Sequence, residues 1–204
     1  MEKLTVLKRL LLATAIGVAL SVVLVFWVLP GYLPDSTDEP VRDFSAVGGD
    51  FSLETLDGPI ERADFEGQVV MLFFGFTHCP DYCLANLATQ RQVLSALEEH
   101  EQGQVRGLFV SVDPERDDLT TLAEYTDFFH PDIIGATGSK SAIDAMTEQF
   151  YATYYFVDTP DSELDYLVEH TTRTYLLGKD GQVVDLFTHD EPYTRILSRI
   201  REVL

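Results

Sequence analysis

The chain has 204 residues and carries 34 acidic against 14 basic side chains, which gives a formal net charge of −20 at pH 7. This excess of acid argues against nucleic-acid binding, because neutralising phosphates requires a basic surface. The length accommodates one globular domain with an appendage, and 46% hydrophobic residues can supply its core. There are two cysteines, Cys79 and Cys83, too few for a disulfide scaffold, so they predict one local site.

Residues 10–29 form an uninterrupted uncharged run that ends in aromatic and proline residues. About 20 helical residues cross the ~30 Å hydrocarbon core of a bilayer. The run is longer than the apolar part of a cleaved signal peptide and lacks its small-residue cleavage pattern. Basic side chains within residues 1–9 place that end in the cytoplasm. We therefore expect a single-pass anchor in the inner membrane, a tether over residues 30–43, and a domain over residues 44–204 on the periplasmic side.

The domain opens with a predicted β-hairpin. Residues 51–56 alternate between apolar and polar, Asp57-Gly58 is a turn signal, and Ile60-Glu61 continues the pattern. The continuous apolar run 69–74 then predicts a strand buried on both faces, and residues 75–80 break it.

Strands and helices alternate in the middle of the domain. Apolar residues at helical spacing predict the helices, and short apolar runs predict the strands. Asp117 or Asp118 is expected to cap the second helix. In chain order we expect a helix over 84–101, a strand over 105–112, a helix over 119–129, a strand over 132–136 and a helix over 139–150.

Residues 151–169 are predicted to form a long mobile loop, since loops of this length are uncommon unless functional. Strands over 172–177 and 182–187 follow, joined by a turn at Lys179-Asp180-Gly181, and a helix over 191–204 ends the chain. This order predicts an α/β layered sheet. With two cysteines after the first buried strand, it resembles a thioredoxin-like fold with an N-terminal β-hairpin, preceded by one transmembrane helix.

Cys79 and Cys83 lie between a buried strand and a predicted helix, in the text Gly75-Phe-Thr-His-Cys-Pro-Asp-Tyr-Cys83. A helix N-terminus favours thiolate over thiol, so we expect both thiol pKa values to be lowered. If the cysteines occupy positions i and i+4 of the first helical turn, both point to one face. Two such thiolates can close a disulfide or share one ion, and soft thiolates select Cu(I), with zinc as a competitor.

A third ligand should complete a metal site, and the histidines are the candidates. His170 stands just before a predicted strand, where thioredoxin-type enzymes usually carry a proline and this chain has none. The loop entering that strand faces the cysteines in a thioredoxin-like sheet, which favours His170 as a ligand. We expect the remaining histidines to be structural or exposed: His78, His100, His130 and His189.

Three segments resemble the Sco/SenC family of copper proteins: residues 75–83, residues 111–117 (Ser-Val-Asp-Pro-Glu-Arg-Asp) and residues 169–181 with their histidine. The resemblance covers most of residues 44–204. It implies copper bound by Cys79, Cys83 and His170, with Cu(I) three-coordinate and Cu(II) recruiting a further ligand. Two departures are visible, Leu84 in place of a common proline and Glu169 in place of a common aspartate.

The resemblance also implies a role in assembling the copper A centre of cytochrome c oxidase. The partners would be its copper-bearing subunit and other periplasmic copper carriers. This favours a copper metallochaperone over an enzyme. The alternative is a thiol-disulfide oxidoreductase acting on partner cysteines, which needs only Cys79 and Cys83. A peroxide-reducing domain is least favoured, because Thr77 is near but no arginine is close in sequence.

Several other residues allow two interpretations. Asp113 either tunes the site indirectly or ends the strand with Arg116 pairing locally. Glu169 could orient or charge-balance the site. Four tyrosines either pack the loop before His170 or form a partner-docking surface, since tyrosine is enriched at interfaces: Tyr151, Tyr154, Tyr155 and Tyr166.

Overall fold

The computed structural model describes residues 14–28, 43–159 and 166–204. The chain divides into two units, residues 1–42 and 43–204. In the first, residues 14–23 are α-helical and continue into the π-helical turn η1 (Leu24–Val28).

The predicted anchor over residues 10–29 lies partly outside the described residues, and the predicted tether over 30–43 lies outside them except for its last residue. Within the described ranges, none of the helices reaches the length and apolar character that crossing a membrane demands.

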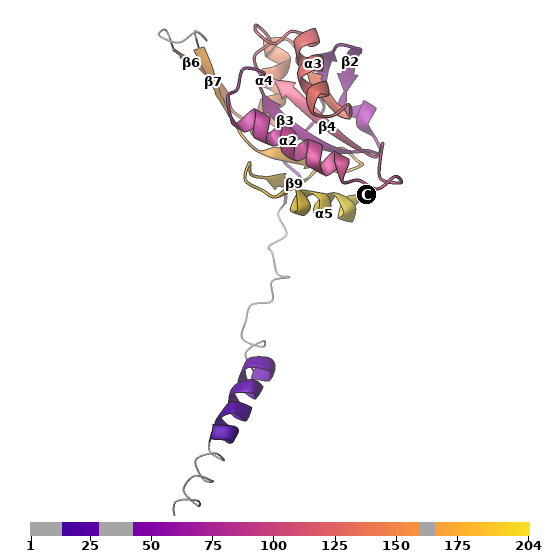
Figure 1. The fold of residues 1–204 in the computed structure, drawn as a ribbon. Helices are drawn as coiled ribbons and strands as arrows, with labels where there is room; N and C mark the ends of the chain where they lie inside the picture. The colour runs from indigo at the N-terminus through magenta and orange to yellow at the C-terminus, as the bar shows by residue number, and fades with distance from the viewer. Residues whose placement is uncertain (1–13, 29–42, 160–165) are drawn as a thin grey trace, which may run out of the picture. The chain divides into compact units, whose positions relative to one another are not determined.

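The centre of the second unit is a five-stranded sheet in the order β5-β4-β3-β8-β9 (Figure 1). Strands β5, β4 and β3 are parallel to one another, β8 pairs antiparallel with β3, and β9 pairs antiparallel with β8. Every residue of β3 is buried, as expected for a central strand covered on both faces. The strands are β3 (Val69–Gly75), β4 (Val105–Ser111), β5 (Ile133–Ala136), β8 (Thr174–Leu177) and β9 (Val183–Phe187).

The predicted N-terminal hairpin is confirmed as β1 (Ser52–Thr55) and β2 (Gly58–Glu61). Gly58 has a φ of +125°, which glycine adopts readily in such a turn. A bridge from Glu54 to Thr137 ties the hairpin to the end of β5, and the short 3-10 helix η3 (Arg62–Phe65) leads into β3.

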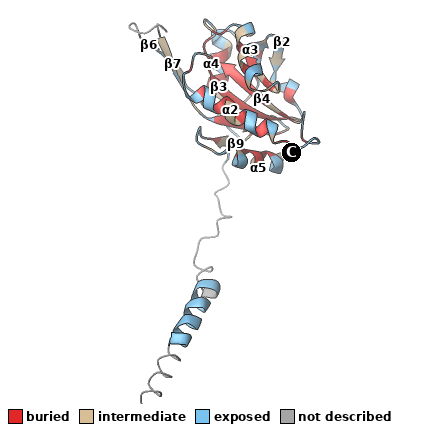
Figure 2. Cartoon of the chain, viewed as in Figure 1, coloured by how far each residue is buried: buried red, intermediate tan, exposed pale blue. Residues whose placement is uncertain are grey.

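Four helices pack around the sheet, and α2 crosses in front of β3 and β4 (Figure 1). Buried residues concentrate on the sheet strands and on the inner sides of the helices (Figure 2). Asp118, one of two predicted caps, accepts a hydrogen bond from Thr121 N and begins α3. The helices are α2 (Tyr82–Ser95), α3 (Leu119–Phe129), α4 (Lys140–Gln149) and α5 (Tyr193–Val203).

Two predictions about the elements are wrong. The helix predicted to reach Glu101 ends at Ser95, because Glu101 instead closes a turn by accepting a hydrogen bond from Glu98 N. The predicted loop over 151–169 contains an antiparallel hairpin, β6 (Tyr154–Asp158) paired with β7 (Tyr166–His170). Aromatic and β-branched side chains in both runs favour strands, a signal that sequence reasoning overlooked.

Candidate metal centre

Cys79 and Cys83 lie where β3 gives way to α2. Cys79 sits in the turn before the helix, where its N–H donates to Phe76 O, and Cys83 is the second helical residue. Cys79 therefore precedes the first helical turn, and only Cys83 lies within it. Both cysteines are nevertheless buried and face one point, with 7% and 0% of their surface exposed, and neither forms a disulfide.

His170 is the last residue of β7, and its imidazole points at the two sulfurs. Its Nε2 atom lies 4.0 Å from Cys79 Sγ and 3.5 Å from Cys83 Sγ. On the other side of the ring, Nδ1 lies 3.0 Å from Thr171 O. When Nδ1 donates its hydrogen to this carbonyl, Nε2 keeps its lone pair toward the sulfurs, the arrangement a metal ligand needs.

The ligand atoms of Cys79, Cys83 and His170 all lie within 4.8 Å of one another. Two sulfurs and one imidazole nitrogen form a soft donor set, which suits Cu(I). Structural zinc sites use four protein ligands, and no fourth histidine, cysteine or carboxylate from the described residues joins this group. The set therefore fits a three-coordinate soft ion better than structural zinc.

The two thiols differ in acidity. A hydrogen bond from the Cys83 thiol, with a further contribution from His170, lowers the pKa of Cys79 to about 4. Burial raises the pKa of Cys83, and the neighbouring Cys79 sulfur raises it further. The expectation of a lowered pKa is thus confirmed for Cys79 and wrong for Cys83. The metal-free pair holds one thiolate and one proton, and a metal that binds both sulfurs must displace that proton.

Aromatic rings and a glycine shape the space around the sulfurs. The rings of Phe73 and Phe76 each stand edge-on to the His170 ring at 5.8 Å between centroids. At Gly75, an added Cβ would lie 2.8 Å from Cys83 Sγ and 2.8 Å from the Phe109 ring, so only glycine lets the sulfur approach the end of β3. Sequence reasoning missed the roles of Phe73, Gly75 and Phe76, because these roles depend on contacts that form only in the folded chain.

The remaining histidines stay outside the group that His170 forms with the sulfurs. His78 Nδ1 lies 3.0 Å from Thr77 Oγ1, and the His189 ring stacks edge-on against Tyr82 at 4.8 Å. His100 lies beside Glu98, and His130 Nδ1 accepts a hydrogen bond from Asp132 N. Their expected structural or exposed roles agree with these contacts.

Asp113 pairs with Arg116, as one of its two interpretations expects, at 2.5 Å between Oδ2 and Nε. It also accepts a hydrogen bond from the hydroxyl of Tyr166 at 2.9 Å. Glu169 accepts a hydrogen bond from Tyr155 at 2.6 Å on the exposed side of the hairpin. Side chains alternate along a strand, so Glu169 faces away from the sulfurs that His170 contacts.

The tyrosines of this region divide between packing and exposure. Tyr154 and Tyr166 are half-buried and pack against the core, as the packing interpretation expects. Tyr151 and Tyr155 are exposed.

Comparison with known proteins places the chain beside one family. A family model described as SCO1/SenC matches residues 39–204. The mitochondrial SCO2 homolog of Mus musculus is 40% identical over 165 residues, which cover 80% of this chain and 64% of the relative. The mitochondrial SCO1 homolog of Homo sapiens is 36% identical over 156 residues, which cover 76% of this chain and 52% of the relative. The chain thus spans less than two thirds of the length of these curated relatives.

Solved structures agree with this relationship. The crystal structure of Arabidopsis thaliana ScoI with copper bound is 33% identical, with a TM-score of 0.71, and covers 78% of this chain and 98% of that chain. The crystal structure of yeast Sco1 with copper bound is 31% identical, with a TM-score of 0.68, and covers 77% of this chain and 87% of that chain.

Proposed function

The chain belongs to the SCO1/SenC family, and we propose that it is a membrane-anchored copper-binding protein that serves the copper A site of cytochrome c oxidase. The observation that carries this proposal is the convergence of Cys79, Cys83 and His170, whose ligand atoms lie within 4.8 Å of one another. Copper would be its cargo, held by two thiolates and one imidazole.

The chemistry of the donor set supports copper as the ion. Thiolates favour Cu(I), and the neutral imidazole of His170 adds a third ligand without adding charge. The surrounding rings of Phe73 and Phe76 are apolar and limit the access of water. A three-coordinate site leaves room for a ligand from a partner, which is what transfer of the ion between two proteins requires.

The N-terminal sequence supports a location at a membrane. We propose that residues 10–29 anchor the chain in the inner membrane, with residues 1–9 in the cytoplasm and the domain on the periplasmic side. Residues 30–43 would tether the domain near the membrane. The net charge of −20 suits recognition of basic partner surfaces, and the proposed partners are the copper-bearing oxidase subunit and other periplasmic copper carriers.

A thiol-disulfide oxidoreductase is a second candidate, favoured by the lowered pKa of Cys79, about 4. In this reaction the Cys79 thiolate attacks a partner disulfide and releases one partner thiolate. Cys83 then gives up its proton and attacks the mixed disulfide, which releases the second partner thiolate. The partner is reduced, Cys79 and Cys83 end as a disulfide, and an external thiol reductant restores them.

A Cu(I) competition assay separates the two candidates. The full-length chain, purified in detergent and reduced, is titrated with Cu(I) against a chelator, beside His170→Ala and the control His189→Ala. The copper proposal expects one Cu(I) per chain and an affinity at least about tenfold lower for His170→Ala, equivalent to about 1.4 kcal/mol. His189→Ala should match wild type.

The opposite results identify the second candidate. If His170→Ala binds Cu(I) as tightly as wild type, His170 is not a ligand. If wild type binds no Cu(I) while its dithiol reduces a partner disulfide, the oxidoreductase is the better account.

A further inference from the structure

Two buried carboxylates lie in the segment Ser111–Asp117, which begins at the last residue of β4 and has no part in the metal centre described above. Asp113 and Asp117 both have 0% of their surface exposed. A buried carboxylate is costly unless hydrogen bonds and charges satisfy it, so its partners are held firmly in place. The partners of Asp117 lie next to the turn that carries Cys79, and the partners of Asp113 lie on or beside the strand that carries His170.

Asp117 holds the turn that carries Cys79. Its carboxylate accepts hydrogen bonds from Thr77 N at 2.9 Å, from Thr77 Oγ1 at 2.5 Å and from Ser111 Oγ at 2.5 Å. Thr77 stands two residues before Cys79, between β3 and α2. Asp117 therefore fastens this turn to the end of β4 through both the backbone and the side chain of Thr77.

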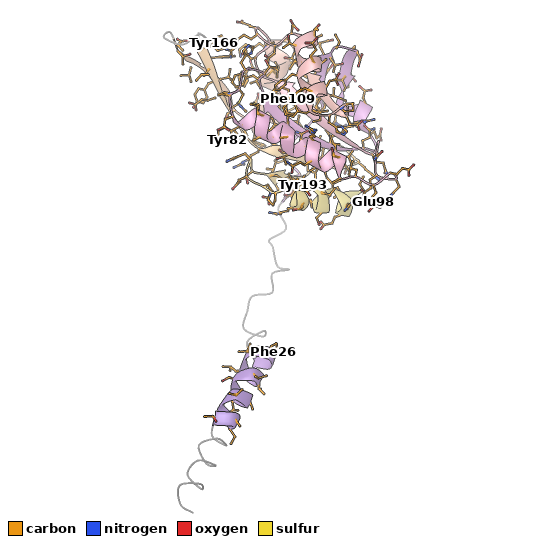
Figure 3. The ribbon with its side chains drawn as sticks, in the orientation of Figure 1. Phe26, Tyr82, Glu98, Phe109, Tyr166 and Tyr193 are labelled. Carbon is orange, nitrogen blue, oxygen red and sulfur yellow. The ribbon has the colours of Figure 1, made fainter. Side chains whose placement is uncertain are left out.

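Asp113 holds the strand that carries His170. It accepts hydrogen bonds from the Tyr166 hydroxyl at 2.9 Å and from Arg116 Nε at 2.5 Å. Arg116 in turn donates to Tyr166 O at 3.0 Å, and its guanidinium lies 3.8 Å from the centre of the Tyr166 ring. Tyr166, which is labelled in Figure 3, is the first residue of β7 and His170 is the last. This Asp113–Arg116–Tyr166 clamp therefore holds the end of the strand that is far from His170.

The clamp matters because the β6–β7 hairpin is a sheet of its own, separate from the five-stranded sheet. No ladder of backbone hydrogen bonds joins the described hairpin to that sheet, so its position depends on side-chain contacts and on the short connection from β7 to β8. Arg116 also lies 5.6 Å from the ring of Phe76, which itself stands edge-on to His170. Arg116 thus contacts both the first residue of β7 and the Phe76 ring, which packs against the His170 imidazole.

We propose that the segment Ser111–Asp117 positions the two sides of the metal centre separately. Asp117 sets the place of Cys79 through Thr77, and the clamp sets the place of His170 through Tyr166. These are positioning residues, which touch no ligand atom of the site. The inference rests on the proposed function, since it treats Cys79, Cys83 and His170 as the ligands.

The clamp is tested with Tyr166→Phe, which removes one hydroxyl, against Tyr155→Phe, which removes a hydroxyl of the same hairpin that bonds Glu169. In the reduced, metal-free full-length chain in detergent, Tyr166→Phe should raise amide hydrogen exchange over residues 167–170 by about tenfold. Its Cu(I) affinity should fall about tenfold, and the equilibrium of its dithiol with glutathione should stay within about twofold of wild type. Tyr155→Phe should match wild type throughout.

The role of Asp117 in positioning Cys79 is tested with Asp117→Asn and with Thr77→Val, a second variant that leaves the buried carboxylate in place. Thr147→Val is the control, a buried threonine whose hydroxyl bonds only its own helix. Both test variants should shift the equilibrium of the dithiol with glutathione by about fivefold or more. Their exchange over residues 167–170 should stay within about twofold of wild type.

The outcomes separate this inference from the proposed function. If wild type binds no Cu(I), the proposed function fails, and the exchange and glutathione measurements still decide the positioning. If Tyr166→Phe behaves as Tyr155→Phe, the clamp does not position His170. If Thr77→Val and Asp117→Asn behave as Thr147→Val in the glutathione equilibrium, Asp117 does not position Cys79.

Discussion

The imidazole Nε2 of His170 lies 3.5 Å from Cys83 Sγ, although 87 positions separate the two residues in the chain. The contact joins two elements that share no sheet, because Cys83 belongs to α2 and His170 to the β6–β7 hairpin. Its geometry therefore depends on how each element is fixed to the five-stranded sheet. Small changes at those fixing points should alter the site without touching a ligand.

Gly75→Ala should weaken metal binding although glycine offers no ligand. The added Cβ would lie 2.8 Å from Cys83 Sγ and 2.8 Å from the Phe109 ring, and overpacking of this kind costs about 1–3 kcal/mol. We expect the displaced sulfur to lower Cu(I) affinity by about tenfold or more in a chelator competition assay.

The control for this substitution is Gly138→Ala, where the nearest atom, Leu53 Cδ2, would lie at 3.3 Å. It should leave Cu(I) affinity unchanged. Equal affinities for wild type and Gly75→Ala would mean that the sulfur has room to move.

Alkylation of the metal-free protein should select Cys79. Its pKa, lowered to about 4, leaves it a thiolate down to that pH, whereas the raised pKa of Cys83 keeps that thiol protonated. The rate of iodoacetamide labelling at Cys79, followed by mass spectrometry, should stay flat as the pH falls from 8 to 5 and should drop near pH 4. Only the thiolate is nucleophilic, so the rate follows its fraction.

Cys83→Ala supplies the control for the alkylation profile, because it removes the hydrogen bond that contributes most to the lowered pKa of Cys79. The drop in labelling rate should then move to higher pH. A wild-type rate that already declines about tenfold per pH unit below pH 8, as an ordinary thiol does, would refute the thiolate at Cys79.

The main elements of this fold were predictable from sequence because their signals are local. The run at β3 is apolar throughout, and Asp57-Gly58 marks the first turn, so both elements follow from short stretches of chain. The hairpin of β6 and β7 is an exception, because its aromatic residues fit packing within a loop as well as pairing between strands. Its Tyr166–Asp113 bond spans 53 positions, and no local pattern encodes such a contact.

The metal centre likewise has features that the sequence predicts and features that only the folded structure reveals. The convergence of Cys79, Cys83 and His170 could be anticipated because the chain has two cysteines and because His170 stands just before a predicted strand whose entry faces them. The unequal pKa values of the thiols could not, because they arise from burial and from the approach of the two sulfurs. The contact between Gly75 and Cys83 likewise exists only after β3 and α2 have packed.

Thr174→Val should destabilise the fold at a point close to the site. Asn86 of α2 donates to Thr174 Oγ1 of β8 at 2.6 Å and accepts from Gln90 at 2.9 Å, and all three residues are buried. Valine keeps the shape but leaves the Asn86 amide without its acceptor, which costs about 1–3 kcal/mol. Urea unfolding should report this loss.

Thr147→Val is the matched control, because its hydroxyl donates only to carbonyls of α4 that already serve the helix. The free energy of unfolding of Thr147→Val should fall by less than about 1 kcal/mol, since no buried donor is left without an acceptor. Equal losses for the two variants would mean that the Asn86 amide finds another acceptor.

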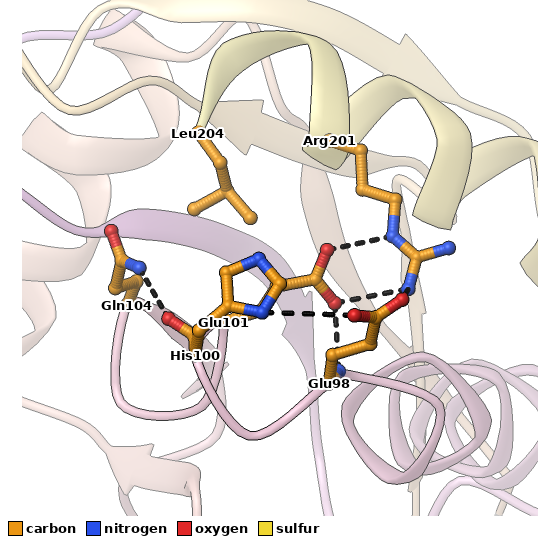
Figure 4. Close-up of a pocket in the computed structure, with 6 residues that line it drawn as sticks. All are labelled: Glu98, His100, Glu101, Gln104, Arg201 and Leu204. Atoms are coloured by element: carbon orange, nitrogen blue, oxygen red, sulfur yellow. Dashed lines mark hydrogen bonds and ion pairs between the residues drawn. The ribbon is translucent and has the colours of Figure 1, made fainter.

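The C-terminal helix should contribute a pH-dependent share of stability through Arg201. Its guanidinium donates from Nε to Glu101 Oε1 at 2.7 Å and from Nη2 to Oε2 at 3.0 Å, beside Glu98 (Figure 4). This pairing lowers the pKa of Glu101 to about 2 from an ordinary value of 4.5. Because Arg201 is partly exposed, water screens the pair, and we expect Arg201→Ala to lower the free energy of unfolding only slightly at pH 7.

The sign of the pH dependence follows from the lowered pKa. A carboxylate with a lower pKa in the folded state stabilises the protein above its unfolded pKa, and this stabilisation fades as the pH falls through the folded value. The gap in the free energy of unfolding between wild type and Arg201→Ala, measured in urea, should therefore be constant above pH 4.5. It should close between pH 4.5 and about 2. Arg195→Ala, which breaks the ion pair between Arg195 of α5 and Glu191 just before the helix, should cost less than about 0.5 kcal/mol. A gap that persists unchanged at pH 2 would mean that Arg201 stabilises α5 through packing of its aliphatic stem and not through the charge of Glu101.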